Sequence, residues 1–446
     1  MDFSMGYHTF EIFRKLSYQD AKTLFEDFQK QDEIRSYQIR KIELEPDADE
    51  FTKWLYSTYP QYHVMDYPGE NKGLKWLMRV SKTSPGYIRR TTTFGDRRYS
   101  VEEDTPCSIR AVYLPKVFCA EVGKKDYLSA ADATDLEAVR VAFDKEAANI
   151  SPVLGQFNQY SMNRGDYCAN FLLEGLERYF SPERTDEIPA LVMELIKRSD
   201  VPLHYDKWTK EGEPDGINTG KHSHYMKSGS TAINIYWKQE QLEIKHPDCP
   251  DIDNSEHLLR FEVQCKYPKM YRMTKELKKD GELLDLISSI LSEDTCADII
   301  SKYFFRVIKP GDYYSFERAG RLILERVTKW EKAERLTDAL KQIVTHGSIA
   351  DAKAAYQSKS KELEDFRRSI RELGQIGINP VTIPDEWKID YLPNLLDFYY
   401  SQMCDTAPLT LAEKHQISEY NSAKIAEMIS DDEMKDGIKY MRKRGR

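Results

Sequence analysis

The spacing of apolar residues changes near residue 280, and this change limits the folds open to the 446-residue chain. Before that point, several short runs alternate apolar and polar residues, which is typical of strands that bury one face. From Asp280 onward, apolar residues recur every three or four positions, which is typical of amphipathic helices. We therefore predict an α+β protein, with a mostly antiparallel sheet domain at residues 1–275 and an all-helical domain at residues 276–446.

The sheet domain is predicted to contain one order of elements twice. A strand and a helix capped by Ser17 precede two further strands, and a strand and a helix at residues 188–196 again precede strands. This order predicts two related half-domains, although no sequence repeat accompanies it. The strands are predicted at residues 7–13, 74–80, 108–118, 163–173, 222–227, 231–238 and 258–266. The later helices are predicted at residues 283–291, 294–304, 315–327, 336–344, 348–356 and 359–373.

The composition excludes several classes of protein. The seven cysteines are scattered without a Cys-x-x-Cys pair, which is typical of reduced cytosolic thiols and not of a disulfide framework or a structural zinc site. The N-terminal residues are charged too early for a signal peptide, and no run approaches the about 20 apolar residues that span a bilayer. We therefore expect a cytoplasmic protein with no membrane partner. The net charge of −9 indicates that any contact with DNA depends on local basic patches.

Three predicted strands concentrate polar side chains on one face. An antiparallel sheet often turns such a face to water, which is one interpretation of the pattern. The other is a functional site, because Asp and Asn are poor strand formers and solvated faces usually carry Thr, Lys or Glu. The opposite face of each strand is apolar and predicts packing against helices. The polar positions are Asp166 and Asn170, then Asn234, Tyr236 and Lys238, then Arg260, Glu262 and Gln264.

Four short motifs in this region resemble, in the same order, the motif series of rolling-circle replication initiators. The motifs are Arg-Gly-Asp-Tyr at 164–167, His-Tyr-Met-Lys-Ser-Gly-Ser at 224–230, Ile-Tyr-Trp-Lys at 235–238 and Leu-Arg-Phe-Glu at 259–262. The initiators of small Gram-positive plasmids and the related relaxases of integrative elements are the most similar. The resemblance covers residues 163–275 well and implies a sheet fold of the HUH or RRM-like type.

The resemblance also implies a reaction and the residues that perform it. Asp166 and Glu262 would bind Mg²⁺ or Mn²⁺, which prefer carboxylate oxygens, and Tyr225 would attack the scissile phosphate. Attack would leave a 5′-phosphotyrosine and a free 3′-OH. A free tyrosine titrates near ~10, so Lys227 or Lys238 would favour its phenolate or hold a phosphate.

The sequence departs from the family pattern and leaves alternatives at the site. Many relatives have Tyr-x-Gly-Ser where this chain has Tyr-Met-Lys-Ser at 225–228, and the His-hydrophobic-His metal motif is absent in its usual form. His222 and His224 lie two apart on a predicted strand, so His224 is a candidate metal ligand or a base for Tyr225. Tyr236 is a rival nucleophile, or a sheet tyrosine that uses its hydroxyl group in a hydrogen bond.

Several segments are candidates for binding origin DNA, both duplex and single-stranded. A basic, tyrosine-containing run follows the Glu262 strand, and the alternative is an ordinary solvated helix. Residues 89–99 predict a basic hairpin with a Gly-Asp turn, and residues 336–374 a helix-turn-helix with its turn at 346–348. The candidate DNA-binding residues are Arg89, Arg90, Arg260, Lys266, Lys269 and Arg272.

The function expected from these motifs is initiation of rolling-circle replication by nicking one DNA strand. A mobilisation relaxase would share the chemistry, and a non-catalytic DNA-binding regulator would share the fold. The chain has no Gly-x-x-x-x-Gly-Lys-Ser/Thr loop, so a host helicase would have to unwind the duplex. A homodimer is a further expectation.

Overall fold

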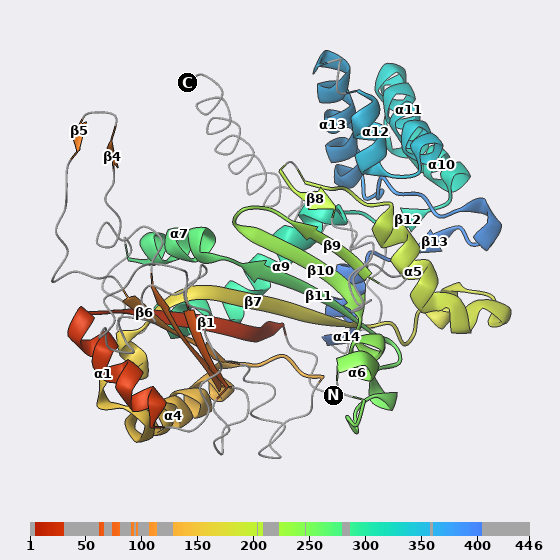
Figure 1. The fold of residues 1–446 in the computed structure, drawn as a ribbon. Coiled ribbons are helices and arrows are strands. Elements are labelled where there is room, and N and C mark those ends of the chain that lie inside the picture. The colour runs from red at the N-terminus through yellow and green to blue at the C-terminus, as the bar shows by residue number, and fades with distance from the viewer. Residues whose placement is uncertain are drawn as a thin grey trace. The chain divides into compact units, whose positions relative to one another are not determined.

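The computed structural model describes residues 5–30, 62–66, 74–80, 91–92, 95–96, 107–113, 128–202, 204–207, 223–245, 247–278, 286–356 and 360–403. Its main feature is a nine-stranded sheet with helices, so the α+β class is confirmed (Figure 1). The sheet strands are β1 (Gly6–Leu16), β2 (Tyr62–Asp66), β3 (Leu74–Val80), β6 (Cys107–Tyr113), β7 (Ser161–Leu172), β8 (Asp206–Lys207), β9 (Ser223–Lys227), β10 (Thr231–Trp237) and β11 (Leu258–Cys265).

The order of the strands in the sheet is β2-β3-β6-β1-β7-β11-β10-β9-β8. The pairs β1–β6, β2–β3, β3–β6, β8–β9 and β9–β10 are antiparallel, in line with the predicted mostly antiparallel sheet. Reading outward, β1 is followed by β6, β3 and β2, and β7 is followed by β11, β10 and β9. Each series places the first strand of its segment beside the last, which is the order expected from two repeats. Their relation as half-domains stays a prediction.

A short separate hairpin lies where a basic hairpin is predicted. Strands β4 (Thr91–Thr92) and β5 (Gly95–Asp96) pair antiparallel. Gly95 and Asp96 therefore lie in the second strand and not in the turn, which corrects the predicted Gly-Asp turn. The flanking arginines Arg89 and Arg90 lie outside the described residues.

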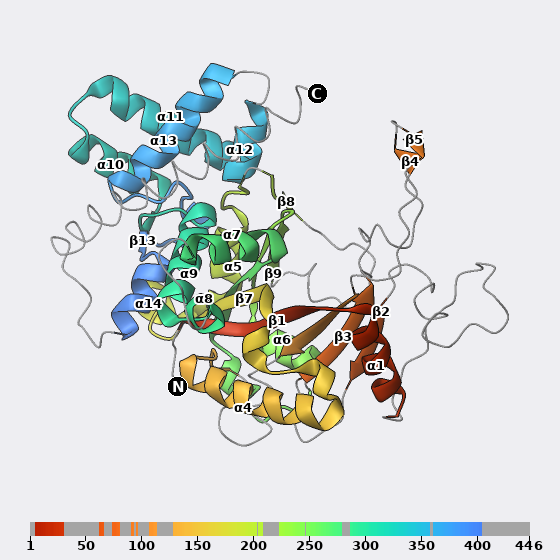
Figure 2. The ribbon, with the colours of Figure 1, turned by 90° about the vertical axis from the view of Figure 1, so that its left-hand side faces the viewer.

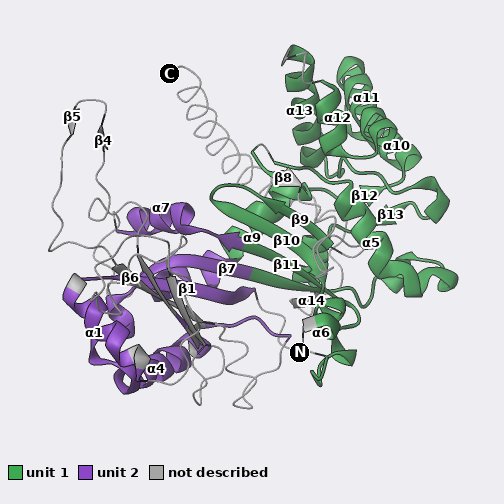
Figure 3. Cartoon of the chain, in the orientation of Figure 1, with its two compact units in different colours: residues 1–4, 168–263, 297–446 green, residues 5–167, 264–296 purple. Residues whose placement is uncertain are grey.

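The chain divides into two compact units, coloured separately in Figure 3. Unit 2 comprises residues 5–167 and 264–296, and unit 1 comprises residues 1–4, 168–263 and 297–446. Each of the strands β7 and β11 contributes residues to both units. The predicted boundary at residue 275 between a sheet domain and a helical domain stays a prediction.

Unit 2 contains the helices α1 (Tyr18–Gln29) and α4 (Ala133–Ile150), which Figure 2 shows beside its strands. Aromatic side chains pack in its core. The Phe143 ring of α4 lies 5.0 Å from Trp76 and 5.4 Å from Phe157. The Ser17 hydroxyl oxygen accepts a 3.0 Å hydrogen bond from the Asp20 amide, which confirms the predicted cap. Helix α4 is missing from our prediction because two of its buried positions are alanines and two are acidic residues, which weakens the apolar periodicity. The other helices here are α7 (Tyr267–Leu277) and α8 (Leu286–Ile290).

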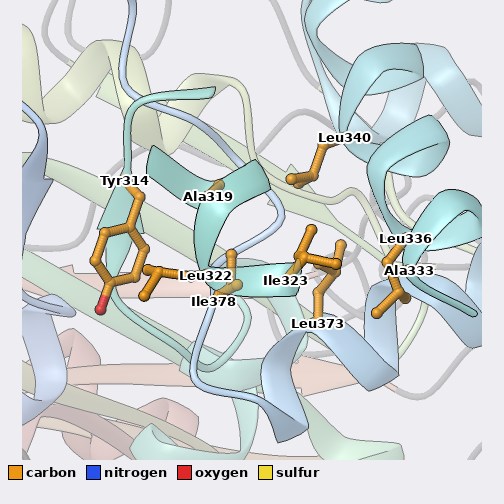
Figure 4. Packing of buried hydrophobic residues seen from close by; sticks show 9 residues of the cluster. All are labelled: Tyr314, Ala319, Leu322, Ile323, Ala333, Leu336, Leu340, Leu373 and Ile378. Atoms are coloured by element: carbon orange, nitrogen blue, oxygen red, sulfur yellow. The ribbon is translucent and has the colours of Figure 1, made fainter. Parts of the chain in front are cut away.

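Unit 1 contains a cluster of nine buried residues contributed largely by three helices, α10 (Phe316–Arg326), α11 (Trp330–His346) and α13 (Ser360–Gln375) (Figure 4). Gly347 ends α11 in the left-handed conformation, at φ 82°, and Ser348 caps the next helix, α12 (Ile349–Ala355). This is the turn predicted at 346–348, although a DNA-binding role for it stays a prediction. The remaining helices are α5 (Ile188–Lys197), α6 (Lys238–Lys245), α9 (Glu293–Val307) and α14 (Leu395–Met403).

Smaller elements complete the fold. Strands β12 (Tyr313–Tyr314) and β13 (Tyr391–Leu392) form a two-stranded sheet. The 3₁₀ helices are η1 (Pro152–Leu154), η2 (Phe157–Gln159), η3 (Glu177–Tyr179), η4 (Pro182–Glu187), η6 (Asp253–Ser255) and η7 (Asp385–Trp387). Within the described ranges, every helix is too short or too polar to cross a lipid bilayer.

Candidate metal centre

Three of the polar positions of β7 and β11 are buried. Asp166 and Asn170 are each 1% exposed, and Arg260 is fully buried. The residues on the other face of these strands are apolar, as predicted. The rings of Phe171 and Phe261 each lie 5.5 Å from the Phe304 ring. Burying charged groups costs free energy unless they are paired, so this face is not an ordinary solvated side of a sheet. The solvent-face interpretation is therefore wrong for these three positions.

Asp166 is held by an arginine two residues earlier on the same strand. The Arg164 Nε atom donates to both carboxylate oxygens of Asp166, at 2.9 and 3.1 Å, and Nη2 donates to one of them. The Nη1 atom of Arg164 donates to Glu11 of β1, 3.1 Å away. The side-chain nitrogen of Asn163 donates a hydrogen bond of 2.7 Å to the other carboxylate oxygen of Glu11. This network compensates for burial of the Asp166 charge and fixes its orientation.

Glu262 of β11 is held by a tyrosine of β10. The Tyr236 hydroxyl group donates to a Glu262 carboxylate oxygen at 3.1 Å. Burial, together with the Glu262 charge, raises the pKa of Tyr236 well above its usual value. A tyrosine whose phenolate is so disfavoured is a poor nucleophile, so we assign Tyr236 to positioning Glu262.

Arg260 lies inside the same face of β11. Its Nε atom donates to the Asn170 side-chain oxygen of β7 at 2.8 Å. Burial opposes its charge, but the neighbouring Cys168, Tyr236 and Glu262 raise the pKa of Arg260 above its usual value. A fully buried guanidinium does not reach a DNA phosphate, and this corrects the predicted DNA contact.

Three side chains with ligand atoms within 4.8 Å of one another form a candidate metal site: His8, Asp166 and Glu262. They come from β1, β7 and β11, which are consecutive strands of the sheet. Asp166 and Glu262 are the two predicted ligands. Two carboxylates and an imidazole suit Mn²⁺, and the carboxylates suit Mg²⁺. The donor set therefore fits the ion that the sequence motifs imply.

His8 is missing from our predicted site. Its position in the chain carries no metal-binding spacing, because the nearest partner ligand lies more than 150 residues away. His8 reaches the site because β1 is the neighbour of β7 in the sheet. The Nδ1 atom of His8 lies 2.6 Å from the Thr9 hydroxyl group, which orients the imidazole ring.

Tyr225 lies half-buried on β9, on the same face as Tyr236. In the β9–β10 register Tyr225 faces Asn234, and directly opposed residues of an antiparallel pair share a face. Asn234 and Tyr236 are two residues apart on β10 and so share that face as well. Lys227, two residues after Tyr225, lies on it too and is half-buried. The register thus places Tyr225 and Lys227 on one face of the β9–β10 pair. Tyr236 contacts Glu262 from the same face.

Two other predicted site residues lie elsewhere. His224 faces Ile235 and therefore points to the opposite side of the sheet from Tyr225. It is not part of the three-residue metal group, so this register does not support a metal role for it. Lys238 begins α6 and does not continue β10; it is buried, and its Nζ atom donates to Gln241 at 2.6 Å. The amine is thus not exposed to a phosphate, and the predicted strand position is corrected. His222 lies outside the described residues.

The basic run after β11 forms helix α7, with Lys266 as its first flanking residue. Lys266 and Lys269 are half-buried, and Arg272 is exposed. A DNA-binding role for these three residues stays a prediction.

No family profile matches the sequence, and no curated protein matches it. Among solved structures, a rolling circle replication initiator protein from Geobacillus stearothermophilus is 11% identical over 62% of this chain and 79% of that chain. The TM-score of this match is 0.24.

Proposed function

We propose that this chain is a metal-dependent, site-specific single-strand DNA endonuclease and strand transferase that initiates rolling-circle replication. The observation that carries the proposal is the convergence of the His8, Asp166 and Glu262 ligand atoms within 4.8 Å. Tyr225 supports it, because its side chain lies on the same face of the β9–β10 pair as Tyr236, which contacts Glu262.

In the proposed reaction the Tyr225 hydroxyl oxygen attacks a DNA phosphorus. A bond forms between that oxygen and phosphorus, and the bond from phosphorus to the 3′ oxygen breaks. The phenol proton is lost to solvent, and the leaving 3′ oxygen takes up a proton to become a 3′-OH. Energy of the broken phosphodiester is conserved in the phosphotyrosine, so the strand can be rejoined later. A bound Mg²⁺ or Mn²⁺ would supply stabilisation of negative charge on the phosphoryl oxygens.

The surrounding side chains have distinct tasks in this proposal. Arg164 and Tyr236 fix the two carboxylates, so that little rearrangement is needed on binding the ion. Lys227 lies on the Tyr225 face, where its positive charge favours the phenolate or holds a phosphate. Asn234 lies opposite Tyr225, and its buried side-chain oxygen has no hydrogen-bond partner among the described residues. It is available to accept a hydrogen bond from the substrate or from Tyr225.

The test is formation of a covalent protein–DNA adduct. A set of oligonucleotides that tiles both strands of the DNA flanking the gene is labelled at the 3′ end and incubated with protein and Mn²⁺. The products are then separated on a denaturing gel. We expect one oligonucleotide to give a labelled adduct, because the segment downstream of the nick stays attached through its 5′ phosphate. Tyr225→Phe should abolish the adduct, and Tyr236→Phe should retain it.

Three results would contradict the proposal or its details. An adduct of unchanged yield in Tyr225→Phe overturns the assignment of the nucleophile. Binding to origin DNA with neither nick nor adduct, in Mg²⁺ or Mn²⁺, identifies a non-catalytic regulator. Mn²⁺ affinity that is unchanged in His8→Ala, measured by calorimetry, removes His8 from the metal site. A mobilisation relaxase would give the same adduct, and plasmid copy number in a strain lacking the gene separates it from an initiator.

A further inference from the structure

Three aromatic rings form a row in unit 2, from β1 to helix α7. The Phe13 ring lies 5.7 Å from Tyr267, and Tyr267 lies 6.1 Å from Tyr271. Tyr267 is 46% exposed and Tyr271 is 55% exposed, although tyrosine rings usually bury more of their surface. The two tyrosines are four residues apart, so they occupy one side of α7. The row thus presents ring surface to solvent, and we call it the aromatic row.

The aromatic row begins beside the network that holds Asp166. Glu11 and Phe13 are two residues apart on β1, where the pairing with β6 continues without interruption from Phe10 to Leu16. They therefore lie on one face of the strand. The Glu11 carboxylate accepts the hydrogen bond from Arg164, which itself holds Asp166. Glu11 thus connects the candidate metal ligand Asp166 to the strand face that carries Phe13.

The charge around the aromatic row differs from that of the whole chain. Residues 266–278 contain five basic side chains and one acidic one, Glu276, whereas the whole chain has a net charge of −9. Lys275 is exposed and follows Tyr271 by four residues, which places it next to the tyrosines on the same side of α7. Lys15 is exposed and shares the β1 face of Phe13. Cations therefore flank the rings at both ends.

We infer that the aromatic row is a stacking platform for the unpaired bases of single-stranded DNA next to the cleavage site. Ring faces stack on base faces with little regard to sequence, and neighbouring cations neutralise the phosphates. A duplex keeps its base faces inside the helix, so the platform selects single strands. The inference rests on the proposed function for its substrate, but it concerns binding and not the chemical step.

The experiment measures binding of a fluorescent 20-nucleotide oligo(dT) by anisotropy in EDTA, so that no cleavage takes place. The variant Tyr267→Ala/Tyr271→Ala should bind at least about tenfold more weakly, because each stacked base contributes on the order of 1–3 kcal/mol. Tyr267→Phe/Tyr271→Phe should bind like the wild type, because both rings remain. Tyr400→Ala is the matched control, since Tyr400 is 42% exposed on α14 and lies outside the row.

A second ligand separates stacking from charge. The wild type should bind an oligonucleotide of abasic residues about as weakly as the double alanine variant binds oligo(dT). Binding of the double alanine variant to oligo(dT) within twofold of the wild type overturns the inference and leaves the row to another class of partner, such as a protein. An equal loss of affinity for duplex DNA also overturns it. The proposed function fails separately, if no adduct forms while this binding pattern holds.

Discussion

Two regions of the chain are buried by opposite means. The polar face of β7 and β11 hides charged groups, and each is compensated by a specific partner, as with Arg164 on Asp166 and Asn170 on Arg260. The helical cluster of α10, α11 and α13 hides apolar side chains such as Leu336 and Leu373. Apolar burial stabilises a fold without demanding direction, whereas a buried ion pair adds little net stability and fixes atoms in place. The comparison teaches that the first region is built for geometry and the second for stability.

The largest effect is expected from Asp166→Asn. The amide keeps the shape of the side chain but loses the charge that binds a divalent cation. We expect the rate of nicking to fall by at least about a thousandfold, which corresponds to roughly 4 kcal/mol, and Mn²⁺ binding to be lost in calorimetry. Nicking at the wild-type rate would mean that this buried carboxylate is structural. The polar face and the helical cluster would then not differ in their roles.

The converse experiment is Leu373→Ala in the helical cluster. Leu373 is fully buried against the other cluster residues, so the substitution leaves a cavity. The free energy of unfolding should fall by about 3 kcal/mol in urea denaturation. The nicking rate per folded molecule at low temperature should not change. A variant of normal stability that has lost nicking would assign the cluster to function.

A third buried group, Asp200, tests whether ion pairs in unit 1 stabilise the fold. Lys309 and Lys353 lie 2.8 and 2.6 Å from its carboxylate. Burial opposes its charge, but the two lysines hold the pKa of Asp200 below its usual value. The unfolded chain then binds the proton more readily, so this contribution to stability is present above about pH 4 and is lost on further acidification. The melting temperature of Asp200→Asn should therefore depend less steeply on pH below about 4 than that of the wild type, by differential scanning fluorimetry.

Tyr236→Phe refines the assignment of roles at the polar face. It removes one hydrogen bond to Glu262 but no ring contact. We expect nicking to slow by about tenfold, or roughly 1.4 kcal/mol, with covalent adduct still formed and with weaker Mn²⁺ binding. Complete loss of adduct, with Tyr225→Phe active, would exchange the two tyrosines in the proposal.

The smallest effect is expected from Ser348→Ala at the start of α12. The Ser348 hydroxyl oxygen accepts a 3.0 Å hydrogen bond from the Asp351 amide. Loss of this cap should lower the free energy of unfolding by about 1 kcal/mol, measured beside Leu373→Ala. A larger loss would show that the turn between α11 and α12 contributes more than its cap.

The sequence alone predicted which side chains share a face. The parity of Asp166 with Asn170, and of Arg260 with Glu262, follows from the two-residue period of a strand, which is a local property of the backbone. The helix starts at Ser17 and Ser348 were predicted for the same reason, because a cap needs only its own first turn.

Only the tertiary structure decided how far those faces are buried and which strands are neighbours. It placed His8 beside Asp166 and enclosed Arg260. These outcomes depend on pairings between segments that are distant in the sequence, and such pairings leave no mark on the local spacing of residues. The physical reason is that the backbone geometry fixes the direction of a side chain within a few residues, whereas its surroundings are fixed only when the whole sheet has formed.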